Sequence, residues 1–137
     1  MGTEEDRNRN ILLLQEYQER MDAIYQHVTL VEELLAEYRR VKSALDEISK
    51  AKEGEEILVP LGGNIFIHAS LKDTSNVMAE VGGGVVTEKS ISKAMTFVDK
   101  KIEELLKEEE NLIKTSQEIK DRVEQISAKL RQAEEKG

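Results

Sequence analysis

The sequence lacks cysteine and tryptophan and contains one proline and two histidines among its 137 residues. Without cysteine there is no disulfide, no thiol nucleophile and no thiolate metal ligand. His27 and His68 lie far apart with no companion ligand at helical spacing, so we predict no metal site. No Gly-Lys-Ser/Thr follows the glycine run at residues 82–84, and there is no serine elbow. The sequence therefore predicts no cofactor and no enzyme.

The sequence also lacks a long apolar run and an excess of positive charge. No segment approaches the roughly 18 apolar residues that span a bilayer, and the N-terminus carries no apolar signal segment, which favours a cytoplasmic protein. The formal net charge is −8, whereas RNA, DNA and anionic lipid need clustered positive charge on the protein. A helical RNA-binding protein would need a basic stripe. A polypeptide is therefore the expected partner.

The composition, 35% charged and 4% aromatic, suits long helices better than a compact globule. Residues 8–53 and 90–134 each carry apolar residues at alternating steps of three and four, and this heptad pattern predicts two long helices. The first seam comprises Leu14, Tyr17, Met21, Ile24, Val28, Val31, Leu35, Tyr38 and Leu45, and the second Ile91, Met95, Val98, Ile102, Leu105, Leu112, Ile119, Val123, Ile126, Leu130 and Ala133.

Polar residues interrupt the heptads and mark the helix ends. Lys42, Glu109 and Ser116 occupy seam positions, either as register-setting residues or, for the long charged side chains, by reaching to water. The expected caps are Asp6, Asn8 or Asn10 for the start of the first helix, Gly54 for its end, and Ser90 for the start of the second.

Four short apolar runs at residues 57–59, 65–71, 77–81 and 85–87 lie between the two helices. Gly62-Gly63-Asn64 separates the first two runs and Gly82-Gly83-Gly84 the last two. Apolar runs joined by three-residue glycine loops indicate two β-hairpins in tandem. Neither face of the run at 65–71 is clearly polar, and so small a unit cannot fold unaided. We therefore expect other chains to cover it.

Two helices of similar length can cover each other's seams by folding back through the hairpins. The predicted fold is α+β: one domain of residues 1–137 with a long antiparallel two-helix coiled coil and two central β-hairpins that join an oligomeric β-barrel body. Both chain ends then meet at one tip. We call the apolar residues there the tip cluster: Ile11, Leu12, Leu13, Leu14, Ile126, Leu130 and Ala133.

The run Ile11 to Leu14 encircles the first helix, so its members cannot all face one partner. Stray leucines at a frayed helix start would explain the run, because scattered surface apolar residues are common. An exposed apolar patch kept for binding would explain it as well. Both interpretations remain open at this point.

Residues 57–95 resemble the alpha-class subunit of prefoldin, a chaperone of archaea and eukaryotes. VPLG at 59–62, KDT at 72–74 and VGGG at 81–84 match similar family segments around the hairpin turns. Two hairpins are typical of the alpha class, whereas the beta class has one. The resemblance implies a hexamer of two alpha-like and four beta-like subunits with a double β-barrel body and six projecting coiled coils. It implies that the tips hold non-native polypeptide without ATP and deliver it to a group II chaperonin.

The resemblance also assigns residues to roles. The tip cluster would bind clients. The hairpin turns would be shaped by Gly62, Gly63, Gly82, Gly83 and Gly84. The oligomeric body would be packed by Ile57, Val59, Ile65, Phe66, Ile67, Leu71, Val77, Val81 and Val85. A filament or scaffold in which the coiled coils serve as spacers is the alternative function, because heptads fit both.

Overall fold

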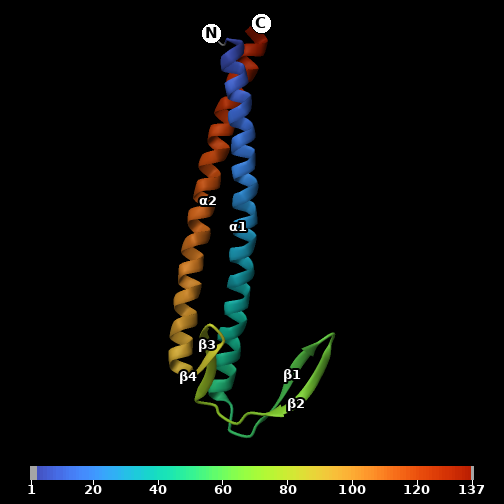
Figure 1. The fold of residues 1–137 in the computed structure, drawn as a ribbon, viewed down its shortest axis with the longest axis vertical. Coiled ribbons are helices and arrows are strands. Elements are labelled where there is room, and N and C mark those ends of the chain that lie inside the picture. Colours follow the sequence, from blue (N-terminus) through green and yellow to red (C-terminus); the bar gives the residue numbers. More distant parts are fainter. Residues whose placement is uncertain (1–2, 137) are drawn as a thin grey trace. The chain divides into compact units, whose positions relative to one another are not determined.

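The computed structural model describes residues 3–136. The elements follow one another as α1, β1, β2, β3, β4 and α2, which confirms two long helices around two hairpins (Figure 1). α1 covers Glu4–Lys50 and α2 covers Ile91–Lys136. No helix within the described residues is long and apolar enough to cross a membrane.

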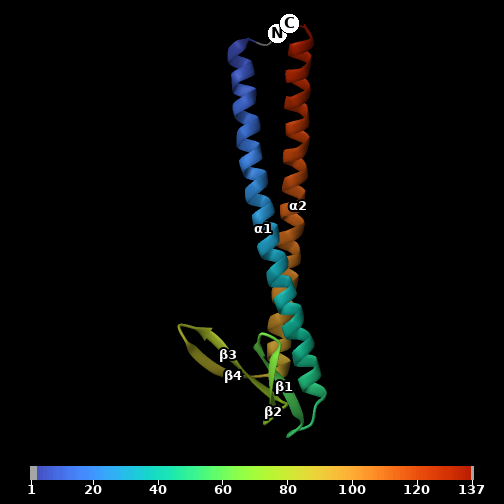
Figure 2. The ribbon, with the colours of Figure 1, turned by 90° about the vertical axis from the view of Figure 1, so that its right-hand side faces the viewer.

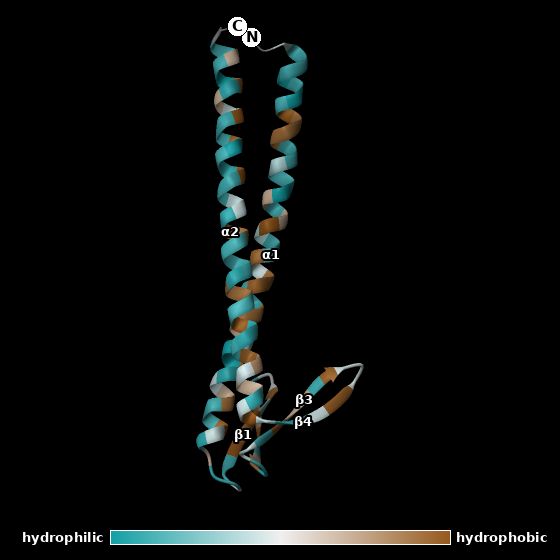
Figure 3. Cartoon of the chain, turned by 90° about the vertical axis from the view of Figure 1, so that its left-hand side faces the viewer, coloured by the Kyte–Doolittle hydropathy of each residue, from teal (hydrophilic) through white to brown (hydrophobic). Residues whose placement is uncertain are grey.

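The chain divides into two compact units. The arm unit comprises Met1–Leu35 and Glu104–Gly137, and the strand unit comprises Ala36–Glu103. Within the arm unit the two helical segments lie side by side and antiparallel, so that the start of α1 and the end of α2 lie at the same end of the unit (Figures 1 and 2). Both helices are mainly hydrophilic with short hydrophobic segments, whereas much of hairpin β3–β4 is hydrophobic (Figure 3).

The seam of the arm unit follows the predicted heptads. Val31, Leu35 and Ile119 are buried in it. Ser116 is buried as well, and its Oγ donates a hydrogen bond to the Ile113 carbonyl oxygen at 2.7 Å. The hydroxyl therefore needs no partner on the other helix, and no buried side-chain polar atom among the described residues lacks a hydrogen bond. Glu109 is half-buried.

Ala133 is the one predicted seam residue of α2 that is exposed, so this part of the prediction was wrong. In the antiparallel register Ala133 comes to the level of Arg7 instead of an apolar residue. Arg7 forms an ion pair with Glu134, Nη2 to Oε1 at 3.5 Å, and both side chains are largely exposed. The apolar seam therefore ends before the last turn of α2.

The core of the strand unit joins both helices to β3. Leu45, Ile91 and Val98 are buried together, and Val77 of β3 packs against them. The partly buried residues around this cluster are Tyr38, Ile48, Ala94, Met95 and Ile102. Lys42 is exposed, as the snorkelling interpretation predicts, and its Nζ lies 2.7 Å from Asp99 Oδ1.

α1 begins four residues earlier than predicted and with a different cap. The Asp6 N–H donates to Thr3 Oγ1 at 3.2 Å, and the Thr3 N–H donates to Asp6 Oδ2 at 3.4 Å. This reciprocal pair makes Thr3 the N-cap. Glu4 and Glu5 in the first turn also suit the positive end of the helix. The predicted cap at Asp6, Asn8 or Asn10 was therefore wrong.

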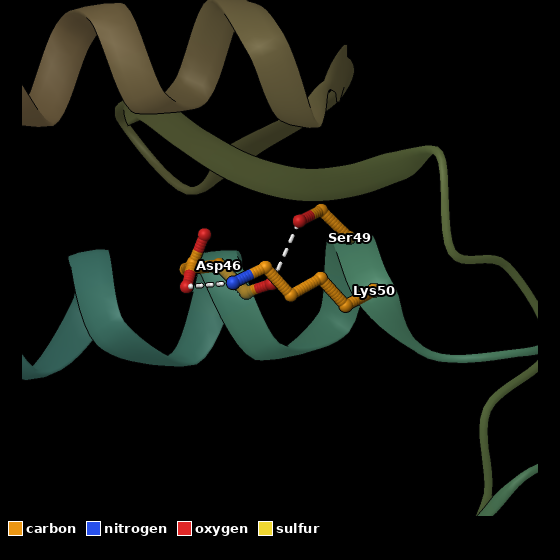
Figure 4. Close-up of polar contacts among 3 residues, drawn as sticks. All are labelled: Asp46, Ser49 and Lys50. Carbon is orange, nitrogen blue, oxygen red and sulfur yellow. Dashed lines mark hydrogen bonds and ion pairs between the residues drawn. The ribbon is translucent and has the colours of Figure 1, made fainter.

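α1 ends at Lys50, before the predicted end. In its last turn Ser49 Oγ donates to the Asp46 carbonyl oxygen at 2.7 Å, and Lys50 Nζ lies 3.2 Å from Asp46 Oδ2 (Figure 4). Gly54 is not the helix cap. It has a φ of +83° within a turn that the Glu55 N–H closes on the Lys52 carbonyl oxygen at 3.0 Å.

α2 begins as predicted. The Lys93 N–H donates to Ser90 Oγ at 3.2 Å, which confirms Ser90 as its N-cap.

The two hairpins are separate two-stranded antiparallel sheets. β1 (Glu56–Gly62) pairs with β2 (Ile65–Ser70), and β3 (Asn76–Gly82) pairs with β4 (Val85–Ser90). Every pair of the second hairpin repeats a pair of the first at an offset of 20 residues, from Glu56 opposite Ser70 and Asn76 opposite Ser90 onward. β1, β3 and β4 extend beyond the apolar runs that predict them, whereas β2 ends one residue before its predicted run does.

The turns are shorter than the predicted three-residue loops. Gly63 and Asn64 have φ of 58° and 63°, and two successive positive values are what a two-residue type I′ turn requires. Gly62 still pairs with Ile65, and the register shift between Pro60 and Gly62 leaves Leu61 as an extra bulge residue. The second hairpin has the same bulge and a Gly83-Gly84 turn. The first glycine of each predicted loop, Gly62 or Gly82, therefore belongs to the strand.

Candidate functional site

The tip cluster divides into exposed and half-buried side chains. Leu12 is 64% exposed and Ile11 is 38% exposed, because both lie outside the heptad seam. Ala133 is exposed too. The half-buried members are Leu13, Leu14, Ile126 and Leu130. Ile11 and Leu12 are therefore the exposed large apolar side chains of the tip cluster, while its half-buried members are partly covered by the chain itself.

The arm unit, which carries the tip cluster, is strongly acidic. The arm unit holds ten basic and seventeen acidic residues, whereas the strand unit holds ten and eleven. Nearly all of the net negative charge therefore lies in the unit that carries the exposed Ile11 and Leu12. Like charge keeps molecules apart in solution, which allows apolar residues to remain exposed without self-association.

The strands carry the largest exposed apolar surface among the described residues. Nine large apolar side chains on them are 47–65% exposed. Five belong to the residues predicted to pack an oligomeric body: Ile65, Phe66, Ile67, Val81 and Val85. The other four are Leu58, Leu61, Met78 and Val86. Patches of this kind on a protein surface mark interaction sites.

The remaining predicted assembly residues are half-buried within the chain itself. They are Ile57, Val59, Leu71 and Val77. Val77 contacts the core formed by Leu45, Ile91 and Val98. One face of hairpin β3–β4 is thus partly covered by the chain's own helices, and its other face is open.

Sequence reasoning missed the four additional strand residues and Asn64. The strand alternation would have found Leu58 and Met78, since each lies on the face opposite Ile57 or Val77. Asn64 has positive φ like the turn glycines, which asparagine tolerates. The exposed apolar residues missed on the helices are Tyr25, Leu30, Leu34, Val41, Phe97, Leu106 and Ile113.

Asp73 organises the connector between the hairpins. Its Oδ1 accepts hydrogen bonds from the Ser75 N–H at 2.8 Å and the Asn76 N–H at 3.1 Å, and its Oδ2 accepts from Asn76 Nδ2 at 3.2 Å. The Ser75 backbone bond, followed by those from Asn76, holds the pKa of Asp73 below its usual range. The ionised side chain therefore fixes the turn that leads into β3.

His27 is an ordinary helix residue with a partner on the other helix. Its Nε2 lies 2.7 Å from Glu108 Oε1, and both side chains are about half exposed. A polar contact so open to solvent contributes little stability. Within the described residues no group of three or more potential ligands could hold a metal ion.

Comparison with known proteins agrees with this geometry. The family model for the prefoldin subunit matches residues 17–136. The chain belongs to the prefoldin family. Prefoldin is a chaperone family without enzymatic activity, and its members form complexes with other prefoldin subunits.

The similar relatives include alpha subunits. Prefoldin subunit alpha of Archaeoglobus fulgidus is 26% identical over 136 residues, which is 99% of each chain. Prefoldin subunit alpha of Pyrococcus horikoshii is 31% identical over 116 residues, covering 81% of this chain and 76% of the relative. These similarities confirm the alpha-class resemblance of the hairpin region.

A solved structure shows the same fold. The filamentous prefoldin of Methanocaldococcus jannaschii matches with a TM-score of 0.72 at 19% identity, covering 85% of this chain and 97% of that one. The coiled coil with central hairpins is therefore a prefoldin fold.

Proposed function

We propose that this chain is the alpha-type subunit of a cytoplasmic prefoldin hexamer of two alpha-like and four beta-like subunits. The hexamer holds non-native polypeptides at its coiled-coil tips without ATP and passes them to a group II chaperonin. The observation that carries this proposal is the exposure of apolar residues in two places. Nine strand residues are 47–65% exposed, and at the tip Ile11 is 38% and Leu12 is 64% exposed.

The strand surface supports assembly with several partners. When partner subunits cover the nine half-exposed apolar side chains, each side chain contributes about 1 kcal/mol to the free energy of binding. Association itself costs about 4 to 15 kcal/mol. The gain and the cost are of similar size, so contact with one neighbour over part of this surface would give only a weak complex. A closed body, in which each subunit contacts several others, uses the whole surface.

The tip supports weak and promiscuous binding. Ile11 and Leu12 together can contribute only about 2 to 4 kcal/mol when a client covers them, whereas micromolar affinity needs about 8 kcal/mol. One tip alone therefore holds a client weakly. Several tips on one body raise the effective concentration, so that the assembly holds a client while each contact can still release it.

The client-binding role is tested with Ile11→Ser/Leu12→Ser against a matched control, Leu30→Ser/Leu34→Ser. All four residues are exposed on α1, but only the first two belong to the tip cluster. In reconstituted complexes we expect the tip variant to weaken binding of an unfolded fluorescent client several-fold. The control variant should bind within twofold of the unmodified complex. Equal binding by the tip and control variants would remove Ile11 and Leu12 from the mechanism.

A filament or scaffold is the second candidate, suggested by the similar filamentous prefoldin. That similarity is 19% in sequence and concerns the fold alone. Sizing separates the two candidates, because a scaffold grows without a partner whereas a chaperone subunit closes into a defined complex with a beta-type subunit.

A further inference from the structure

Lysines gather where β4 leads into α2. The only carboxylate between residues 89 and 101 belongs to Asp99, and its Oδ1 already lies 2.7 Å from Lys42 Nζ. A chain with a net charge of −8 therefore carries a local excess of positive charge here. The lysines of this segment are Lys89 near the end of β4 and Lys93, Lys100 and Lys101 in the first part of α2.

An exposed aromatic ring lies among these lysines. Phe97 is 47% exposed. Lys89 Nζ lies 5.4 Å from the centroid of its ring and Lys101 Nζ lies 5.6 Å from it, both within the range of cation–π attraction. Lys93, Phe97 and Lys100 are spaced by four and three residues, which places them on one face of α2. We call Lys89, Lys93, Phe97, Lys100 and Lys101 the basic patch.

The charge of the basic patch is largely unpaired. Among residues 3–136 no ion pair involves Lys89, Lys93 or Lys100. Lys93 and Lys100 are exposed, and Lys89 is half-buried. Glu88 and Lys89 are consecutive in a strand, so their side chains point to opposite faces of the hairpin. An open hollow at this junction is lined by Thr87, Glu88, Lys89, Ser90 and Lys93.

The basic patch is distinct from the strand surface and the tip cluster. Lys89 lies opposite Val77 across the β3–β4 pair, and directly opposite residues share a face of a sheet. Val77 packs against the helix core. Lys89 is therefore on the helix side of the hairpin, whereas Met78 and Val86 are on the open face. No member of the basic patch belongs to the tip cluster.

We propose that the basic patch binds an acidic segment of another polypeptide, in which an aromatic or aliphatic side chain stands next to several carboxylates. The carboxylates pair with Lys89 and Lys93, and the apolar side chain covers the exposed part of Phe97. Charge favours a peptide over nucleic acid, because the acidic remainder of the chain repels an extended polyanion. A short acidic segment contacts the patch alone. The inference goes beyond the proposed function, since neither assembly nor capture of clients at the tips uses these residues.

The test measures the fluorescence anisotropy of a labelled peptide of six glutamates around one tryptophan. We expect the unmodified chain to bind it, both alone and after mixing with a beta-type subunit, and to bind it less tightly as the salt concentration rises. Lys89→Gln/Lys93→Gln should weaken binding about fivefold or more. The matched control is Lys52→Gln/Lys72→Gln, which removes two exposed lysines elsewhere in the strand unit. It should bind within twofold of the unmodified chain.

A charge-reversal variant separates direct contact from damage to the fold. Lys89→Glu/Lys93→Glu should lose the glutamate peptide and bind a peptide of six lysines around one tryptophan more tightly than the unmodified chain does. A misfolded variant would not exchange one preference for the other.

Equal binding of the glutamate peptide by Lys89→Gln/Lys93→Gln and the control would overturn the inference. Loss of binding when the beta-type subunit is added would overturn it as well, because the patch would then belong to the assembly interface. Tighter binding of a single-stranded RNA with the same number of charges would overturn the choice of a peptide as partner.

Discussion

The two hairpins share a register, a bulge and a two-residue turn at an offset of 20 residues, yet they present different chemistry. At equivalent positions the first has Phe66 and His68, and the second has Val86 and Glu88. Only the second contributes a residue, Val77, to the helix core. The comparison shows that a few backbone requirements set the hairpin geometry, which leaves the other side chains free to define what each hairpin contacts.

The contact of the second hairpin with the helix core, which the first hairpin lacks, predicts the largest effect on stability. Val77→Asp places a charge against the apolar core of Leu45, Ile91 and Val98 and should lower the free energy of unfolding by about 2 to 3 kcal/mol. The equivalent change Ile57→Asp lies outside that core and should cost less than about 1 kcal/mol in the isolated chain. Urea unfolding followed by circular dichroism measures both. Equal losses would show that the hairpins are anchored alike.

The turn chemistry predicts an intermediate effect. Gly84 has a φ of 77°, and Asn64 holds the equivalent position at 63°. Gly84→Val puts a β-branched residue into a left-handed conformation and should cost about 1 to 2 kcal/mol. Gly84→Asn reproduces the first hairpin and should cost less than about 0.5 kcal/mol. The same unfolding measurement checks the pair, and a Val variant as stable as the Asn variant would argue against the type I′ turn.

The connector between the hairpins predicts the smallest effect, and one that depends on pH. Hydrogen bonds from Ser75 and Asn76 lower the pKa of Asp73 in the folded chain. Its stabilisation is therefore complete above the unfolded pKa and is lost as the pH falls through the lowered folded value. Asp73→Ala should be slightly less stable than the unmodified chain at pH 7, and the gap should close on acidification below about pH 4. A pH-independent gap in urea midpoints would contradict this.

The sequence predicted the elements more reliably than their ends. The heptads of α1 and α2 identify the helices because their spacing repeats along the chain. The glycines identify the hairpin turns because glycine permits a positive φ. The start of α1 escaped prediction because Thr3 and Asp6 cap it jointly, and a polar stretch offers several candidate caps. Gly54 was misassigned because a positive φ serves a β-turn as well as a helix end.

The candidate sites could be predicted as regions but not residue by residue. The run Ile11 to Leu14 marks the tip, yet only the seam geometry shows that Ile11 and Leu12 are exposed while Leu13 and Leu14 are half-buried. Similarly, alternation places apolar residues on both faces of the strands. The contact of Val77 with the helix core depends on tertiary packing, which a local pattern does not contain.

The central claim is that other subunits cover the exposed strands of this chain. The most direct measurement is the native mass of the chain mixed with a beta-type prefoldin subunit. A closed complex with two copies of this chain and four of the partner is the predicted result. A folded monomer that stays apart from the beta-type subunit at every concentration would contradict it.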